Sequence, residues 1–159
     1  MVKVLFICLG NICRSPAAHG VFQSLIEKKG LEGQLFVDSA GTSAFHEGEL
    51  PDQRMREHGL KRGLKLESLS RKLVVKDFDE FDYLIVMDES NYKNSYKLAT
   101  KDQHREKLYR MADFLTTFKD DEIPDPYYGG SDGFEYVLDL VTEGSENLMN
   151  KILNERKLG

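Results

Sequence analysis

The amino-acid sequence predicts one domain of the α/β class over residues 1–159, with a doubly wound, four-stranded parallel sheet and helices on both faces. The length of 159 residues suits a single domain, and the 40% of hydrophobic residues can fill its core. Short apolar, β-branched runs, typical of strands buried on both faces, alternate with amphipathic segments. Such alternation gives parallel strands joined by right-handed helical crossovers. The chain shows no internal repeat, low-complexity tract or linker.

The first strand and the first helix are the clearest predicted elements. Residues 2–9 read Val-Lys-Val-Leu-Phe-Ile-Cys-Leu, an apolar run interrupted only by Lys3, which predicts a central strand. After a short loop, Ser15 is placed to cap a helix, Pro16 suits its first position, and Gly30 ends it. Between them, apolar residues recur at helical spacing: Ala18, Val21, Phe22, Leu25 and Ile26.

The rest of the chain continues the alternation. The predicted elements are a strand at 35–39, a helix at 51–58, a buried strand at 83–87, a weakly helical stretch at 91–99, a strand near 107–111 and a last amphipathic helix over 134–153. Sheets of this kind bind ligands at the carboxyl ends of their strands. The loop after the first strand lies at such an end, so residues 8–16, here called the cysteine loop, are the first candidate for a functional site.

The composition narrows the function classes. A net charge of −5 and a pI near 5.4 argue against a general nucleic-acid binder. The two cysteines, Cys8 and Cys13, fall in one loop and cannot form a disulfide scaffold, so a reducing, cytoplasmic setting is expected. The apolar run at the start is too short for a membrane span and lacks a signal-peptide cleavage site. No membrane segment is predicted elsewhere.

The cysteine loop reads Cys-Leu-Gly-Asn-Ile-Cys-Arg-Ser-Pro, which suits an anion cradle. Gly10 and Asn11 readily adopt left-handed backbone angles, so successive N–H groups can point inward. The helix start at Ser15 adds free N–H groups and the positive end of the helix dipole. Arg14 adds a planar fork that matches two oxygens of a phosphate. The residues predicted to bind phosphate are Leu9, Gly10, Asn11, Ile12, Cys13, Arg14 and Ser15.

A cysteine at the base of this positive bowl can act as a nucleophile. Positive surroundings favour the thiolate, so Cys8 is predicted to attack phosphorus and form a thiophosphate that water later releases. A buried structural cysteine is the simplest alternative, but the arginine six positions on and the Ser-Pro helix start disfavour it. Scattered histidines and the lack of a C-x-x-C pair argue against a metal site, and the lack of G-K-[ST] argues against a nucleotide loop. No metal or cofactor is predicted.

The cysteine loop resembles the active-site loop of the low-molecular-weight protein tyrosine phosphatases, which is a cysteine, five residues, an arginine and Ser or Thr near the amino terminus. The likeness continues in order along nearly the whole chain, in Asp38-Ser39-Ala40-Gly41-Thr42-Ser43, Phe81-Asp82-Tyr83, Met87-Asp88-Glu89-Ser90-Asn91 and Asp125-Pro126-Tyr127-Tyr128-Gly129. The resemblance implies a flavodoxin-like phosphatase fold. It also implies hydrolysis of protein phosphotyrosine and small aryl phosphates without a cofactor.

The same resemblance assigns roles outside the cysteine loop. Asp125 matches the Asp of the family's Asp-Pro motif, which protonates the leaving tyrosine oxygen and then activates the hydrolytic water. The candidate walls of a deep slot for phosphotyrosine are Leu9, Phe45, Tyr127 and Tyr128.

Further residues are expected to support the cysteine loop. The resemblance implies that Asn11 and Ser15 brace the loop and the thiolate, with Ser39 as a hydrogen-bond partner of Asn11. Some eukaryotic members carry a supporting histidine near the position of Ser68, and this chain offers none there. What takes its place is left open by the sequence.

Several alternatives share the fold or the loop. Protein arginine phosphatases tend to carry Thr at the position of Ile12 and to lack the paired tyrosines, so this chain favours phosphotyrosine. Thioredoxin-coupled arsenate reductases need two cysteines beyond Cys8 and Cys13. A phosphocysteine carrier would lack a general acid. A catalytically inactive phosphate-binding module would not need the intact set of Cys, Arg and Asp.

The remaining expectations concern partners and redox chemistry. The expected partners are tyrosine-phosphorylated substrate proteins and a tyrosine kinase, with no nucleic acid or membrane, and the chain is expected to be monomeric. The nearness of Cys8 and Cys13 predicts a reversible disulfide that shields the thiolate from irreversible oxidation.

Overall fold

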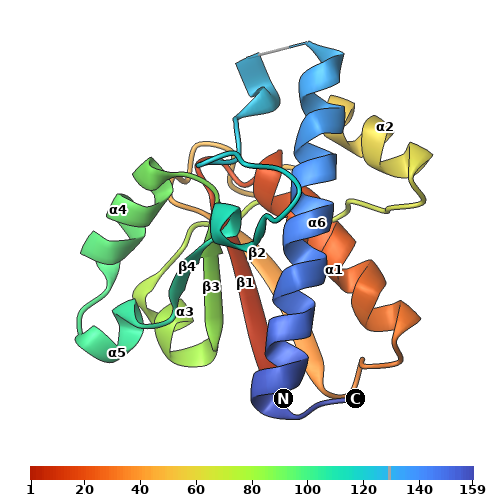
Figure 1. Ribbon diagram of the computed structural model, residues 1–159. Helices are drawn as coiled ribbons and strands as arrows, with labels where there is room; N and C mark the ends of the chain where they lie inside the picture. The colour runs from red at the N-terminus through yellow and green to blue at the C-terminus, as the bar shows by residue number, and fades with distance from the viewer. Residues whose placement is uncertain (129) are drawn as a thin grey trace.

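A parallel sheet with strand order β2-β1-β3-β4 forms the centre of the computed structural model (Figure 1). The structure describes residues 1–128 and 130–159, and for Tyr128 and Ser131 it describes the backbone only. The four strands are β1 (Val2–Cys8), β2 (Leu35–Gly41), β3 (Tyr83–Val86) and β4 (Leu108–Arg110). The predicted class, a four-stranded parallel α/β sheet, is confirmed.

Helices cover both faces of the sheet (Figure 1). One face packs against α1 (Arg14–Lys28) and the long α6 (Ser131–Arg156), with α2 (Gln53–Lys61) beside α6. The other face packs against α3 (Val75–Glu80) and α4 (Glu89–Leu98). The short helix α5 (Asp102–Arg105) and the 3-10 turns η1 (Met111–Phe114) and η2 (Pro126–Tyr128) complete the described elements.

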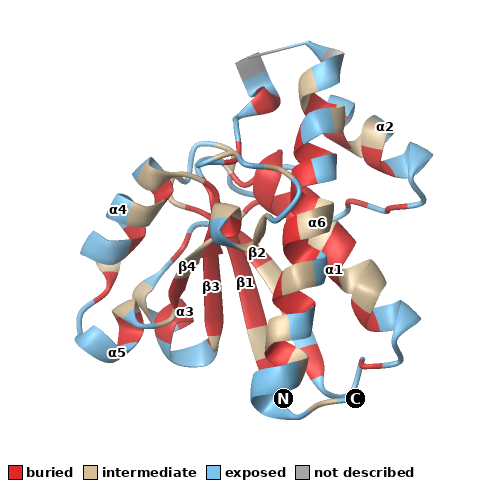
Figure 2. Cartoon of the chain, in the orientation of Figure 1, coloured by how far each residue is buried: buried red, intermediate tan, exposed pale blue. Residues whose placement is uncertain are grey.

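Strand β1 is buried on both faces, which explains its continuous apolar run (Figure 2). Successive side chains of a strand point to opposite faces. Accordingly Val4 and Phe6 belong to the core beneath α1 and α6, and Leu5 and Ile7 belong to the core beneath α3 and α4. The ring of Phe6 packs edge-on against Phe22 of α1, with 5.7 Å between ring centroids. This packing holds together β1 and α1, the two elements that flank the cysteine loop.

All four predicted helices begin at other residues than expected; α4 starts at Glu89 instead of 91, and α6 starts at Ser131 instead of 134. Helix α1 begins at Arg14, so Ser15 lies inside its first turn and does not cap it. Helix α2 runs from Gln53 to Lys61 instead of 51–58. Its start follows from Asp52, whose carboxylate accepts the N–H of Arg54 at 2.8 Å and caps the helix.

The helices α3 and α5 were not predicted. They contain six and four residues, too few for a helical hydrophobic period to show in the sequence. At the start of α3, the carboxylate of Asp77 accepts the N–H of Val74 at 2.9 Å. This contact stabilises the first turn of a helix that has little intrinsic signal.

The cysteine loop lies at the carboxyl end of the sheet, between the end of β1 at Cys8 and the start of α1 at Arg14. Both chain termini lie at the opposite end of the sheet (Figure 1). Strands β2 and β3 also end near the loop, at Gly41 and Val86, so the segments that follow them can contribute to one site. Among the described residues, no helix combines the length and apolarity that crossing a membrane requires.

Candidate active site

The backbone of the cysteine loop curls at Asn11, whose φ of +56° lies in the left-handed region, as the sequence predicted. Gly10 does not adopt a positive φ, so its expected left-handed conformation is wrong. The missing side chain instead avoids crowding, because a Cβ at Gly10 would lie 3.0 Å from Cδ2 of His46.

The segment after β2 holds the cysteine loop from one side. The N–H of Thr42 donates to the carbonyl of Cys8, and the N–H of Ser43 donates to that of Leu9, both at 2.9 Å. A Cβ on Gly41 would lie 2.8 Å from the carbonyl oxygen of Leu9, closer than real Cβ contacts come. The glycine at this strand end therefore permits the close approach of the two backbones.

The sulfur of Cys8 lies at the end of a chain of hydrogen bonds. Cys8 is 3% exposed, and its Sγ lies 3.0 Å from Oγ of Ser15. Nδ2 of Asn11 donates to the same Ser15 oxygen at 2.7 Å. Because the hydroxyl of Ser15 accepts from Asn11, its own proton is available to the sulfur. Ser15 thus contacts the candidate nucleophile directly, a use that its position inside the first turn of α1 allows.

The guanidinium of Arg14 is buried and held by three oxygens. Nη1 donates to Oδ2 of Asp88 at 2.7 Å and to the carbonyl of Ile123 at 3.0 Å, and Nη2 lies 3.6 Å from Oδ2 of Asp125. Burial disfavours the charged form, but the negative groups around the guanidinium, Cys8 first, outweigh it and raise the pKa of Arg14 above its usual value. The guanidinium of Arg14 is therefore always charged, and its three oxygen contacts fix its orientation.

The role of Asp88 was not predicted from the motif that contains it. Its Oδ1 accepts the N–H of Asn91 at 2.7 Å and caps α4, while its Oδ2 orients Arg14. An Asp directly after a buried strand and before a helix is a common capping signal. The second contact spans 74 positions and leaves no local trace in the sequence.

Asp125 reaches the same cavity from the segment before η2. Its Oδ1 accepts the N–H of Tyr127 at 3.1 Å, which orients the carboxylate, and its Oδ2 faces Arg14. Its side chain is 30% exposed, so the group lies at the wall of the cavity and keeps access to solvent. From this position the carboxyl group of Asp125 could first donate a proton and later act as the base that activates water.

A cavity of about 310 Å³ opens above Cys8. Its described lining consists of Cys8, Leu9, Gly10, Ile12, Cys13, Arg14, Ser43, Phe45, His46, Asp125 and Tyr127. Three of the expected walls are present, and the fourth, the side chain of Tyr128, lies outside the described residues. Phe45 is 82% exposed and forms the outer rim.

His46 lines the cavity and was missed by the sequence analysis. Its ring packs edge-on against Phe45 at 4.9 Å between centroids and lies 6.2 Å from the ring of Tyr127. Its Nδ1 lies 3.0 Å from a carboxylate oxygen of Glu49. A single histidine in a polar loop gives no sequence signal that it lines a cavity.

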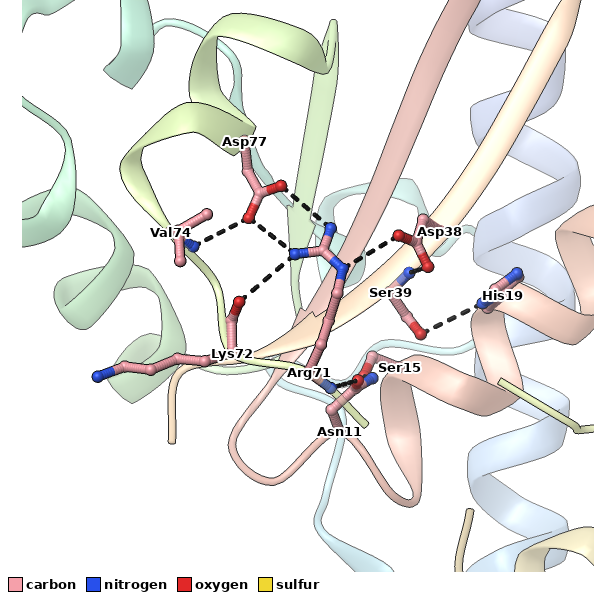
Figure 3. A network of polar contacts seen from close by, with 9 residues as sticks. All are labelled: Asn11, Ser15, His19, Asp38, Ser39, Arg71, Lys72, Val74 and Asp77. Carbon is pink, nitrogen blue, oxygen red and sulfur yellow. Dashed lines mark hydrogen bonds and ion pairs between the residues drawn. The ribbon is translucent and has the colours of Figure 1, made fainter. Parts of the chain in front are cut away.

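The expected bond from Ser39 to Asn11 is wrong, because the hydroxyl of Ser39 lies 3.2 Å from Nδ1 of His19 (Figure 3). Oδ1 of Asn11 instead accepts the backbone N–H of Arg71 at 3.0 Å. The guanidinium of Arg71 lies between the carboxylates of Asp38, at 3.1 Å, and Asp77, at 3.0 Å (Figure 3). Two carboxylates thus anchor the residue that supports the cysteine loop.

Cys13 is a buried thiol whose surroundings differ from those of Cys8. Both cysteines are free in the structure. Burial, followed by the negative charge of Asp52, raises the pKa of Cys13 far above its usual value. Cys13 is therefore protonated at neutral pH and is a poor nucleophile by itself. Within the described residues, no group of three or more His, Cys, Asp or Glu is arranged to hold a metal ion.

Comparison with known proteins identifies the family. The model of the family described as low molecular weight phosphotyrosine protein phosphatase matches residues 3–158. The chain belongs to this family. It is accordingly a hydrolase, a protein tyrosine phosphatase of low molecular weight, as its motifs indicated.

Individual relatives match this chain over nearly their whole lengths. A putative low molecular weight protein-tyrosine-phosphatase from Synechocystis sp. is 43% identical, over 97% of this chain and 98% of its own. A solved protein tyrosine phosphatase from Entamoeba histolytica, with Hepes in its active site, has 46% identity and a TM-score of 0.94 over 99% of this chain and 100% of its own. A solved drosophila arginine phosphatase has 31% identity and a TM-score of 0.86 over 94% of this chain and 97% of its own.

Proposed function

We propose that this phosphatase hydrolyses phosphotyrosine in proteins, and small aryl phosphates, through a cysteinyl-phosphate intermediate on Cys8. One observation carries the proposal: a buried cysteine and a fixed guanidinium from the cysteine loop, Cys8 and Arg14, line the same cavity as the carboxylate of Asp125, which is more than a hundred positions away in the chain. The amides of residues 9–15 and Arg14 bind the phosphoryl oxygens and their increasing charge in the transition state.

The reaction has two displacements at phosphorus. In the first, the Cys8 thiolate forms the S–P bond, the P–O bond to tyrosine breaks, and Asp125 gives its proton to the leaving oxygen. In the second, the Asp125 carboxylate takes a proton from water, the water oxygen bonds to phosphorus and the S–P bond breaks. Inorganic phosphate leaves, and both side chains return to their starting states.

The cavity walls favour a flat aromatic substrate. Leu9, Phe45 and Tyr127 present apolar and aromatic surface above the floor formed by the cysteine loop. A long phosphotyrosine can reach Cys8 from this rim, whereas the phosphate of a phosphoserine would stop short of it.

Phosphoarginine is the alternative substrate, because an arginine phosphatase shares the fold. Ile12 lines the cavity where arginine phosphatases tend to carry Thr, which favours phosphotyrosine. A panel of phosphotyrosine, phosphoserine, phosphoarginine and arsenate, with wild type and Cys8→Ser, tests this choice. Phosphotyrosine should be turned over fastest, and faster turnover of phosphoarginine or arsenate would reassign the substrate.

We further propose that the protein acts as a single-domain monomer in the cytoplasm, without metal or cofactor. Its partners would be tyrosine-phosphorylated proteins and a tyrosine kinase. The acidic net charge of −5 makes nucleic acid an unsuitable partner.

Replacing Asp125 by Asn should affect substrates according to their leaving groups. Phenyl phosphate needs a proton on its leaving oxygen, so its kcat/KM should fall by about 10²-fold or more, while p-nitrophenyl phosphate, which needs less protonation, should lose only about tenfold. The matched control is Asp121→Asn, an exposed carboxylate four positions earlier. Equal losses for both esters would remove Asp125 from the role of general acid.

Oxidation should be reversible if Cys8 and Cys13 form a disulfide. After brief peroxide treatment, a dithiol should restore most activity of the wild type and little activity of Cys13→Ser, because only the wild type can protect the oxidised Cys8. The raised pKa of Cys13 predicts faster protection at higher pH, where more of its thiolate is present. If both proteins lose activity at the same rate and neither recovers, Cys13 only fills space.

A further inference from the structure

Ser70 connects the cysteine loop to the segment that carries the mouth of the cavity. Its hydroxyl donates to the carbonyl oxygen of Gly10 at 2.9 Å. Its backbone pairs with residues 48–49: the N–H of Ser70 donates to the carbonyl of Glu49, and its carbonyl accepts the N–H of Gly48, both at 2.8 Å. Ser70 is only 3% exposed, so water competes little for these bonds.

The bond from Ser70 sets the direction of one peptide group. In a trans peptide, the C=O of one residue and the N–H of the next point in opposite directions, and the described chain contains no cis peptide bond. With the carbonyl of Gly10 turned toward Ser70, the N–H of Asn11 points away from Ser70. The residues on either side of Asn11, Gly10 and Ile12, line the cavity.

This peptide needs outside support. Asn11 has a φ of +56°, a left-handed conformation that asparagine adopts more readily than most residues but that still costs free energy, which contacts with its surroundings must offset. Arg71 fixes the side chain of Asn11 through its backbone N–H, at 3.0 Å. Ser70 fixes the carbonyl immediately before Asn11. Two consecutive residues, Ser70 and Arg71, therefore hold the turn from both sides.

We propose that Ser70 is a positioning residue of the phosphatase: its hydroxyl keeps the N–H of Asn11 aimed at the phosphoryl oxygens. Ser70 touches no reacting atom and acts through the Gly10–Asn11 peptide. The inference rests on the proposed function, because that function places the phosphoryl group in the cavity. It adds a residue outside the cysteine loop to the machinery that binds the transition state.

The test compares Ser70→Ala with two other variants. Ser70→Ala removes the hydroxyl and keeps the backbone pairing with residues 48–49. Its kcat/KM for p-nitrophenyl phosphate should fall about tenfold, because one N–H bond to a charged oxygen is misaligned. Ser70→Thr keeps the hydroxyl and should stay within about threefold of wild type. Ser68→Ala, two residues earlier in the same segment, should change kcat/KM by less than about twofold.

Inhibition separates positioning from a general loss of stability. Vanadate mimics the five-coordinate transition state, so its inhibition constant should rise about tenfold in Ser70→Ala, and that of inorganic phosphate should rise less. Rates and inhibition constants are expressed per folded active site, so partial unfolding cannot imitate the effect. Unchanged constants per site in Ser70→Ala would overturn the proposal even if its melting temperature fell.

Two further outcomes are informative. If Ser70→Ala does not fold, Ser70→Cys preserves the volume with a much weaker donor and should show the same loss in kcat/KM and vanadate binding. Wild-type constants in that variant would overturn the proposal. Turnover by Cys8→Ser would contradict the proposed function itself, whereas normal behaviour of the Ser70 variants with an inactive Cys8→Ser would contradict the Ser70 assignment only.

Discussion

Cys8→Ser is expected to abolish turnover of p-nitrophenyl phosphate, with a loss in kcat on the order of 10⁴-fold or more. The serine hydroxyl is protonated at neutral pH, and no residue beside it in the cysteine loop is placed as a base to activate it. The neighbouring Ser15 hydroxyl already accepts from Asn11 and offers only a proton.

Binding provides the internal control for this variant. Arg14 and the loop amides remain in Cys8→Ser, so inorganic phosphate should still bind within about tenfold of the wild-type affinity. Loss of turnover together with loss of phosphate binding would mean that the loop had collapsed. Turnover above about one per cent of wild type would show that the sulfur is not the nucleophile.

Arg14→Lys is expected to lower kcat/KM by about 10³-fold. Lysine keeps the positive charge but loses the planar fork that can hold a phosphoryl group with two N–H groups while contacting Asp88. The carboxylate of Asp88 and the carbonyl of Ile123 would also lose the hydrogen bonds that they now accept from Arg14. The inhibition constants of phosphate and vanadate should rise together, since both ligands use the fork.

Arg62→Lys is the matched control. Arg62 is another ion-paired arginine, with contacts to Glu135 and Asp139 at 2.8 Å, and it lies outside the described lining of the cavity. Its replacement should leave kcat/KM within about twofold. An Arg14→Lys variant that retained more than a tenth of the wild-type kcat/KM would show that charge alone, without the fork, is sufficient.

The sequence predicts best the parts that local patterns determine. The two-sided burial of β1 follows from an apolar run without alternation, and the left-handed turn at Asn11 follows from a residue type that tolerates it. The helix starts were less accurate: Ser15 suits a cap by type, but α1 begins at Arg14, two residues before the predicted first position at Pro16, and the Ser15 hydroxyl contacts the sulfur of Cys8 instead.

Contacts between distant segments could not be predicted from one sequence. Ser39 is close to the loop, yet its partner is His19, and the partner of Asn11 is the backbone of Arg71, sixty positions away. Ser70 and Asp88 act on the cysteine loop through contacts over 60 and 74 positions. Contacts over such separations leave no local pattern in the sequence, so only the folded chain reveals them.

The central claim, that Cys8 carries the phosphoryl group between two displacements, is tested most directly by trapping the intermediate. Asp125→Asn with p-nitrophenyl phosphate should form it readily and hydrolyse it slowly, because the leaving group needs little help and the water lacks its base. After rapid mixing and a denaturing quench, mass spectrometry should find one phosphoryl group per protein, on Cys8. Turnover without a phosphorylated enzyme, or a phosphoryl group on another residue, would contradict the account.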